Sequence, residues 1–315
     1  MAHRHIPKMA MRRIGGTPKP PSRKLRSVRF LVLVIGVCCV ASAAILARYG
    51  LQAGESPTSL SAWRLVAASL GLIAFQCVRR PSRKVEGADR IRCIGAGVAL
   101  ALHFATWIAS LQLISVAQST LLVATSPLWA GLLGLVVPSL KPRPIFWFGL
   151  AIAGLGTYLI TSGGFAGSPS AWQGDILATI GAVCIVPYLI FSQEVQKRAG
   201  TLLTITWIYS SAAIGLLATL AIQGKLVIPH SAMAWQSILG MAVFAQLIGH
   251  SSLNYSLKNF TAAQVASTTL LEPVFAAVLA WVCLGEAVTW LQGLGGAVLL
   301  FGVGLGLQSR EPVQL

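Results

Sequence analysis

Charged residues are scarce in this sequence of 315 residues. They make up 10% of the chain, against about 25% in an ordinary soluble domain. Apolar residues make up 55%, and the mean hydropathy is +0.74. A water-soluble fold of this length would have too few charges to cover its surface. The composition therefore excludes soluble, disordered and collagen-like proteins, and it favours a polytopic membrane protein whose apolar segments each cross the bilayer.

Several chemical motifs are also missing. The six cysteines form no C-x-x-C pair, so neither a zinc site nor a disulfide framework is expected, and they are interpreted as small apolar residues. The absence of G-x-x-x-x-G-K-[ST] excludes a nucleotide-driven pump within this chain. The absence of H-E-x-x-H and of paired acidic residues inside apolar stretches argues against a membrane-embedded enzyme. We expect no cofactor and no metal ion.

Acidic residues are rarer than basic ones, with eight against 24, which gives a net charge of +16. The basic residues lie mostly between the apolar stretches and do not alternate with aromatic residues, so a nucleic-acid partner is not expected. If the N-terminus is cytoplasmic, 21 basic residues fall on the cytoplasmic side, and Arg48, Arg64 and Lys225 fall outside. The positive-inside rule therefore predicts that both termini are cytoplasmic.

Ten apolar segments predict an all-α fold with ten transmembrane helices. Their hydrophobicity is continuous rather than alternating, which excludes a β-barrel. Residues 1–28 are predicted to form a disordered basic tail, and residues 309–315 a second cytoplasmic tail. Ala41-Ser42-Ala43 is similar to a signal-peptidase site, but the first apolar stretch is too long for a signal peptide, so we expect it to be retained. The predicted helices are 29–49, 60–78, 94–113, 116–137, 145–162, 172–192, 203–222, 235–256, 262–284 and 289–308.

The second half of the chain repeats the first. AQSTLLVATSPLWAGLLG (117–134) aligns with AQVASTTLLEPVFAAVLA (263–280), with the proline and the first two residues of each segment in register. Five helices per half is an odd number, so the two halves, 29–162 and 172–308, are predicted to enter the membrane from opposite sides. Such inverted repeats are typical of secondary transporters.

Three short motifs carry a resemblance to a known family. Asp175 follows a short loop, Leu271-Glu272-Pro273 lies in the predicted helix 262–284, and Leu284-Gly285-Glu286 ends that helix. Together with the duplication, they resemble the EamA-type, ten-helix branch of the drug/metabolite transporter superfamily over roughly residues 30–308. The first half departs from the pattern, because Pro138-Ser139-Leu140-Lys141 stands where Leu-Gly-Glu is expected. The resemblance implies a transporter.

Glu272 is the only acidic residue deep inside a predicted span. A charged carboxylate costs about 2.5–3.5 kcal/mol at the bilayer centre on insertion scales. Glu272 is therefore a candidate for proton coupling, with a neutral, hydrogen-bonded structural carboxyl group as the alternative. His103 and His250 are further candidates because histidine titrates near neutrality, and a histidine bonded to a neighbouring carbonyl group is the alternative.

Polar residues that recur at helical spacing are candidates to line a substrate cavity. Pro127 and Pro273 are predicted to remove the helical partners of the Val123 and Thr269 carbonyl groups. Matching helix breaks in both halves indicate a binding site at the membrane midplane, although prolines also serve as plain kinks. The cavity candidates are Trp107, Ser110, Gln118, Ser126, Gln246, Asn254, Tyr255, Gln264 and Thr268, with Arg64 as a further member.

Other residues have two interpretations. Arg64, beside Trp63 at the predicted outer end of helix 60–78, is interpreted as snorkelling to the headgroups. The family resemblance implies an arginine here and leaves a gating or anion-contacting role as the alternative. Asp175 and Glu286 are interpreted as structural residues at helix ends. Gly302-x-x-x-Gly306 predicts close helix packing, either within one subunit or in a homodimer.

These patterns predict a secondary-active transporter of small metabolites or drugs in the plasma or inner membrane. We expect proton-coupled export by alternating access around a midplane cavity. Its expected partners are a small-molecule substrate, protons and the lipid bilayer. An uncoupled exchanger or uptake carrier is the first alternative, and a non-transporting membrane subunit or receptor is the second.

Overall fold

The computed structural model describes residues 23–79, 83–133, 144–164, 170–256, 269 and 271–307. Over these ranges the chain is helical and contains no strand. The helices are α1 (Arg23–Gln52), α2 (Pro57–Arg79), α3 (Ala88–Ser110), α4 (Val116–Val123), α5 (Ser126–Leu133), α6 (Pro144–Gly164), α7 (Ala171–Ala199), α8 (Thr201–Ile222), α9 (Ala232–Gly240), the π-helix η2 (Met241–His250), α10 (Ser251–Ser256), α12 (Glu272–Leu284) and α13 (Trp290–Leu307).

Seven helical segments of the described chain are long and apolar enough to cross a membrane. They are α1, α2, α3, α7, α8, the pair α4 and α5 taken together, and the continuous run of α9, η2 and α10. The apolar helices α6, α12 and α13 are shorter over the described residues. The all-helical membrane fold is thereby confirmed, while ten crossings and cytoplasmic termini stay predictions.

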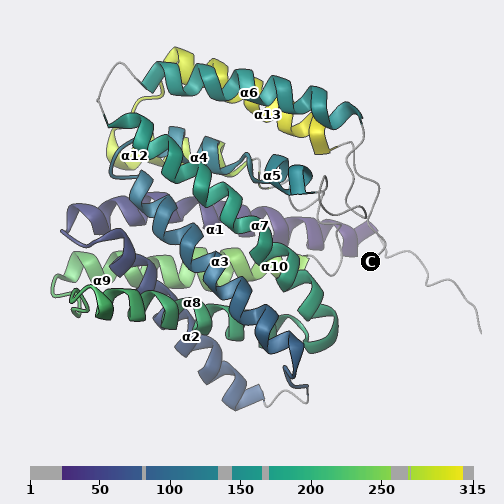
Figure 1. Cartoon of the computed structure of the whole chain (residues 1–315), viewed down its shortest axis with the longest axis vertical. Helices are drawn as coiled ribbons and strands as arrows, with labels where there is room; N and C mark the ends of the chain where they lie inside the picture. Colours follow the sequence, from purple (N-terminus) through teal and green to yellow (C-terminus); the bar gives the residue numbers. More distant parts are fainter. Residues whose placement is uncertain are drawn as a thin grey trace, which may run out of the picture.

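Equivalent helices of the two halves pack against each other. In the order of the chain, α2 contacts α8, α4 contacts α12, and α6 contacts α13, and the last pair lies side by side along one edge of the molecule (Figure 1). The remaining contacts are reciprocal, because α1 packs on η2 and its flanking helices while α3 packs on α7. Each of these contacts between helices therefore has an equivalent contact when the two halves are exchanged.

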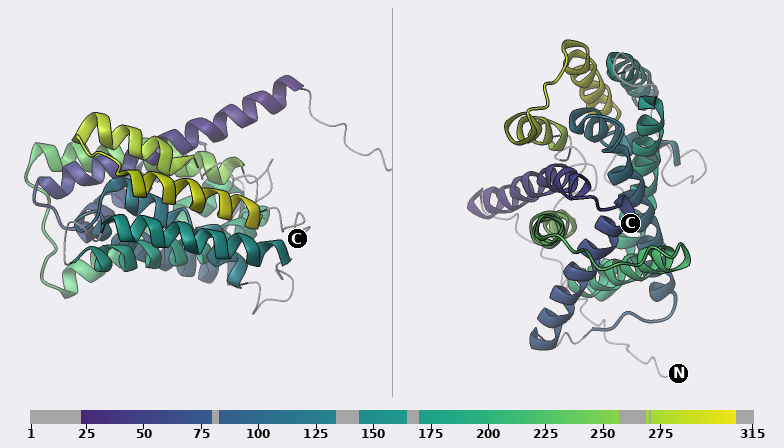
Figure 2. Two further views of the ribbon diagram at one scale, coloured as in Figure 1. Left: turned by 90° about the horizontal axis from the view of Figure 1, so that it is seen from above. Right: turned by 90° about the vertical axis from the view of Figure 1, so that its left-hand side faces the viewer.

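The first helix is an integral part of this bundle. Val37 and Ala47 on α1 are completely buried, and α1 contacts η2 and α12. Only its N-terminal end projects beyond the other helices (Figure 2).

Glycines bring α6 and α13 into close contact. A Cβ atom on Gly302 would overlap the backbone of Ala153, and one on Gly156 would overlap the backbone of Leu299. Small residues at such positions let membrane helices approach closely. The sequence left open whether the glycines of α13 pack within one subunit or in a homodimer. Gly302 packs against α6 of the same subunit.

The segment that contains Pro127 is broken, as the sequence suggested. The single predicted helix 116–137 is instead divided into α4 and α5 around residues 124–125. The Val123 carbonyl group, which loses its helical partner to the proline, accepts a hydrogen bond of 2.5 Å from the Ser126 hydroxyl. The Thr125 hydroxyl likewise donates to the Leu122 carbonyl group at 2.6 Å. Side-chain hydroxyls thus satisfy the backbone at the break.

Glu272 and Pro273 form the first turn of α12. The prediction placed Glu272 near the middle of helix 262–284, but α12 begins at Glu272. Pro273 is therefore in the first turn, where the missing N–H group has no intrahelical acceptor and costs nothing. Of the other polar positions predicted on this segment, Gln264 and Thr268 lie outside the described residues.

Candidate functional site

Arg64 on α2 is completely buried, with 0% of its surface exposed. Its Nη2 atom donates a hydrogen bond of 2.7 Å to Oε1 of Gln246, and its guanidinium carbon lies 3.9 Å from the centroid of the Phe104 ring. The interpretation of Arg64 as a headgroup-snorkelling residue is therefore wrong. The physical reason is that α9 and η2 cover α2 at this level, so Arg64 faces protein instead of lipid.

The π-helix η2 aims two side chains at Arg64. Met241 Sδ lies 3.9 Å from Arg64 Nη1, and Gln246, five residues further along, binds Nη2. In an α-helix, residues five apart point about 140° away from each other. In a π-helix the backbone hydrogen bonds join residues five apart, which brings such side chains onto one face. The four-residue stripe predicted for Gln246, His250 and Asn254 is split for the same reason.

Two buried N–H groups next to Phe104, Arg64 Nε and Trp107 Nε1, have no hydrogen-bond partner among the described residues. Gln246 Nε2 and Tyr209 Oη are also buried here, and these two side chains interact with each other. Tyr209 interacts electrostatically with Arg64 and lies beside Gln246, and the Trp107 ring is 6.5 Å from that of Phe104, between centroids. We call these four donor residues the arginine cluster. Tyr209 and Phe104 carry no distinguishing pattern in the sequence and were not predicted.

Asn254 belongs to a different polar group, which is fully hydrogen-bonded. Its Nδ2 atom donates to Tyr188 Oη at 2.7 Å, and its Oδ1 atom accepts from the Ser192 hydroxyl and from Gln196 Nε2, each at 2.9 Å. We call these four residues the asparagine network. It connects α10 to α7, so Asn254, a cavity candidate in the sequence, is placed at a helix contact. The four-residue spacing of Tyr188, Ser192 and Gln196 places them on one face of a helix, and it could have predicted this group.

The two candidate histidines are buried on either side of Phe104. His103 Nδ1 lies 2.9 Å from the Gly181 carbonyl oxygen, and because that oxygen only accepts, Nδ1 carries the hydrogen and donates it. The His250 ring meets the edge of Phe104 at 5.5 Å between centroids, and the Trp107 ring stacks on His103 at 6.2 Å. Both histidines therefore lie next to the arginine cluster.

Gln118 and Ser110 are occupied by contacts within the protein. Gln118 Nε2 donates to Asp175 Oδ1 at 2.6 Å, and its Oε1 accepts from Gln292 at 3.1 Å. The Ser110 and Ser119 hydroxyl oxygens are 2.7 Å apart and buried. Asp175 follows the first turn of α7 instead of beginning it. These side chains join α3, α4, α7 and α13.

A cavity of about 360 Å³ lies between α1, α2, α8 and the run from η2 to α10. Its lining includes Leu72, Leu247, Ser251 and Tyr255, the last of which was a cavity candidate. The residues of the arginine cluster do not line this cavity, but two lining residues adjoin Gln246: Leu247 follows it in the chain, and the Ser251 hydroxyl donates to the Gln246 carbonyl oxygen at 3.1 Å.

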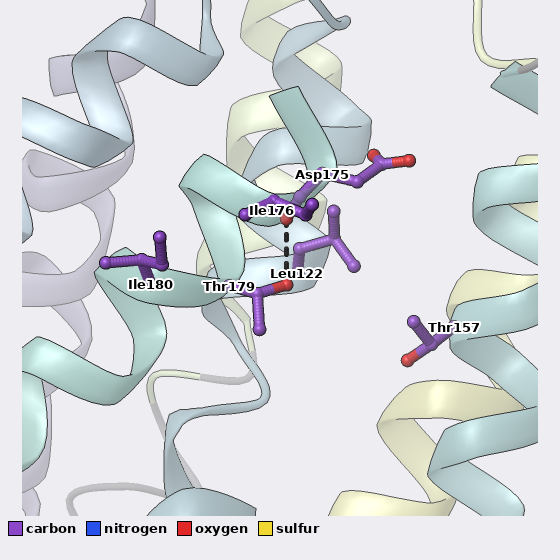
Figure 3. Close-up of a pocket in the computed structure, with 6 residues that line it drawn as sticks. All are labelled: Leu122, Thr157, Asp175, Ile176, Thr179 and Ile180. Carbon is purple, nitrogen blue, oxygen red and sulfur yellow. Dashed lines mark hydrogen bonds between the residues drawn. The ribbon is translucent and has the colours of Figure 1, made fainter. Parts of the chain in front are cut away.

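A second cavity of about 210 Å³ separates α7 and α4 from α6 (Figure 3). Thr157 lines it from α6, and Asp175 lines it from α7. The Thr179 hydroxyl donates to the Asp175 carbonyl oxygen at 2.8 Å, and the remaining lining is Leu122, Ile176 and Ile180. Its polar groups are therefore largely engaged, and it offers little for specific recognition.

The opposite end of α1 from the larger cavity is closed by an ion pair. Arg48 Nη2 lies 2.7 Å from Glu286 Oε1 and donates to the Ile114 carbonyl oxygen at 3.0 Å. Glu286 Oε2 accepts from the Val116 backbone N–H at 2.8 Å, at the start of α4. This contact joins α1, the connection between α3 and α4, and the end of α12, in keeping with the structural role expected of Glu286.

Comparison with known proteins identifies the family. Residues 29–162 and 172–307 match the EamA-like transporter family, and the chain belongs to it. It is 27% identical over 280 residues to the uncharacterized transporter YdfC of Bacillus subtilis, over 86% of this chain and 87% of that protein. It is 24% identical over 252 residues to the uncharacterized inner membrane transporter YedA of Escherichia coli, over 78% and 80%. A protein crystal structure with 18% identity has a TM-score of 0.66, over 90% of this chain and 98% of that one. The resemblance inferred from the motifs is confirmed.

Proposed function

We propose that this member of the EamA-like transporter family is a secondary-active transporter of small metabolites or drugs in the plasma or inner membrane. It works by alternating access between its two halves and exports its substrate in exchange for protons. The observation that carries the proposal is a cavity at one end of the bundle, next to buried polar side chains from both halves, combined with an ion pair at the other end.

Both halves contribute to the arginine cluster. Arg64 and Trp107 come from the first half, whereas Tyr209 and Gln246 come from the second. In transporters built from inverted repeats, the substrate site lies at the interface of the repeats, and rocking of one against the other exposes it alternately to each side. The reciprocal packing of the two halves supports such a movement.

The charges suggest which side the cavity faces. The end of the bundle where the cavity lies also carries Arg79 and Arg198, and the segment before α1 is rich in basic residues. The positive-inside rule assigns this end to the cytoplasm. In this arrangement the cavity faces inward, and the Arg48–Glu286 contact closes the outer end. The outward-facing state requires that contact to open.

Glu272 is the proposed proton-coupling group. Two described carboxyl groups lie inside apolar helices away from any ion pair, and one of them, Asp175, is bound by Gln118. Glu272 is half-buried in the first turn of α12, which packs against α1 and α4. A movement between the halves would shift these contacts and so alter the surroundings of the carboxyl group. Ionisable groups inside membrane segments commonly form proton relays.

The test uses purified protein in liposomes that contain a pH-sensitive dye. Amino acids, nucleotide-related metabolites and cationic drugs are added one at a time. The wild type is expected to move protons with one class of compound, and Glu272→Gln is expected to abolish that flux. Glu194→Gln, the same chemical change at an exposed ion pair on α7, is the matched control and should retain it.

Uncoupled exchange is the second candidate function. It is favoured by the position of Glu272 in the first turn of α12, where the helix dipole stabilises a permanent negative charge. In that case, Glu272→Gln would leave substrate accumulation undiminished, which contradicts proton coupling. Radiolabelled substrate would still exchange across the membrane, so transport itself would stand.

A further inference from the structure

We propose that the arginine cluster binds the carboxylate group of the substrate, so that the transported compounds are small organic acids. This inference rests on the proposed transport function, because a ligand would reach the cluster from the larger cavity, whose lining residues Leu247 and Ser251 adjoin Gln246. It adds a substrate class and assigns the recognition of charge to Arg64.

The positive charge of Arg64 has no counter-charge in the described chain. The seven carboxylates of the described residues lie elsewhere. Three of them are in ion pairs: Asp89 and Glu194 with Arg92 and Arg198, and Glu286 with Arg48. Two are bound by polar side chains, Asp175 by Gln118 and Glu55 by Ser59. Of the other two, Glu86 is exposed in a turn and Glu272 is on α12. Charged groups inside membrane segments normally pair with one another, and an unpaired one marks a functional site.

The unsatisfied groups of the cluster match an anion. Two of them, Arg64 Nε and Trp107 Nε1, are unpartnered N–H groups in the described chain that donate and cannot accept. The oxygen of the Gln246 side chain is already bound by Arg64, so its NH₂ group, which lies beside Tyr209, is the part that can donate to a ligand. A carboxylate has two oxygens with about four acceptor positions. It could therefore accept from several of these donors at once, which neither a cation nor an apolar group could do.

Phe104 determines which part of the guanidinium group is open. Its ring covers the face of Arg64 at 3.9 Å, whereas the Nε atom on the edge has no partner within the described structure. Binding at the edge is the geometry in which arginine holds a carboxylate through two parallel hydrogen bonds. The organic part of the ligand would then lie toward Leu247 and Ser251, which line the cavity. Because Arg64 is fully enclosed in this conformation, the cavity must extend past these residues to admit the ligand.

Binding is tested with acid–amide pairs of equal shape. Benzoate and benzamide, and butyrate and butyramide, are titrated into purified wild-type protein in chloride-free buffer, by calorimetry and by the melting temperature. The acids are expected to bind at least about tenfold more tightly than the amides, since the loss of one charged hydrogen bond has this size. Arg64→Gln is expected to lose this preference, and Arg64→Lys to keep part of it. Arg198→Gln, at an exposed ion pair on α7, is the matched control and should bind like the wild type.

Equal binding of acid and amide by the wild type would overturn the inference, and this comparison needs no variant to fold. Unchanged benzoate binding by Arg64→Gln would overturn it too. So would a melting temperature that chloride raises and the carboxylates do not. The two proposals fail separately. Transport of a neutral or cationic compound without carboxylate binding would leave the transport function standing. Carboxylate binding without transport in liposomes would leave the anion site and contradict the transport function.

Discussion

The arginine cluster and the asparagine network are both polar groups buried among apolar helices, yet their hydrogen bonding is opposite. In the network, Asn254 donates to Tyr188 and to the His250 carbonyl oxygen and accepts from two side chains. In the cluster, the Arg64 Nε and Trp107 Nε1 donors remain without an acceptor in the described part of the chain. A buried polar group without a partner costs about 1–3 kcal/mol. The network therefore stabilises the fold, whereas the cluster costs stability, as expected of a binding site.

Two arginines differ in the same way, one having a bonded partner of opposite charge and the other none among the described residues. Arg48 is paired with Glu286 at the outer end of the bundle, and about a fifth of each side chain is exposed. Arg64 is fully buried and has no anionic partner in the described chain. If the comparison is right, changes at Arg64 alter transport more than stability, and changes in the asparagine network do the reverse.

Replacement of Arg64 should have the strongest effect on transport. Arg64→Met removes a contact to bound substrate worth about 3 kcal/mol, which corresponds to roughly 100-fold in rate at low substrate concentration. The melting temperature is expected to stay level or to rise, because an unpaired buried charge is also removed. Arg64→Met with Gln246→Leu controls for the amide left behind. Full transport with a lowered melting temperature would show that Arg64 is merely structural.

The asparagine network should show the opposite pattern. Asn254→Leu deprives Tyr188, Ser192 and Gln196 of their common partner and is expected to lower the free energy of unfolding by about 2 kcal/mol. Tyr188→Phe, which removes only one hydroxyl, should cost less. Denaturation in SDS measures both. Transport per folded molecule should persist, and its loss at unchanged stability would reverse the assignment of the two regions.

Two glycines on α13 provide a comparison for the stability effects of substitutions in the bundle. Gly302→Ala would force a Cβ atom against the backbone of Ala153, and overpacking of this kind costs about 1–3 kcal/mol. Gly304→Ala, on the same helix with open space around it, should be neutral or slightly stabilising. Equal melting temperatures for the two variants would show that the α6–α13 contact is looser than described.

Glu286→Gln should have the smallest effect on stability. The Arg48–Glu286 pair is partly exposed, and such pairs contribute at most about 1 kcal/mol. Its removal should instead favour opening of the outer end, seen as faster labelling, by a membrane-impermeant thiol reagent, of a cysteine introduced at the buried Ile114. A stability loss as large as that of Asn254→Leu would mean that the contact holds the fold together.

The helices were largely predictable because each apolar stretch is long enough to cross a bilayer. The free carbonyl group of Val123 followed directly from Pro127. The position of Arg64 did not follow, because the Trp63–Arg64 pair is typical of a membrane interface, and the sequence does not say that α9 and η2 cover this part of α2. The π-helical geometry was also hidden, since it depends on Met241 and Gln246 packing against the same guanidinium group.

The most direct test of the account is to locate a bound carboxylate. Crystals of the wild-type protein grown with 4-bromobenzoate would reveal the bromine by its anomalous scattering. The account predicts the carboxylate within hydrogen-bonding distance of Arg64 Nε, with the bromine toward Leu247 and Ser251. A ligand bound at any other place, or an Arg64 that remains enclosed by Phe104 and Gln246 at saturating ligand, would contradict it.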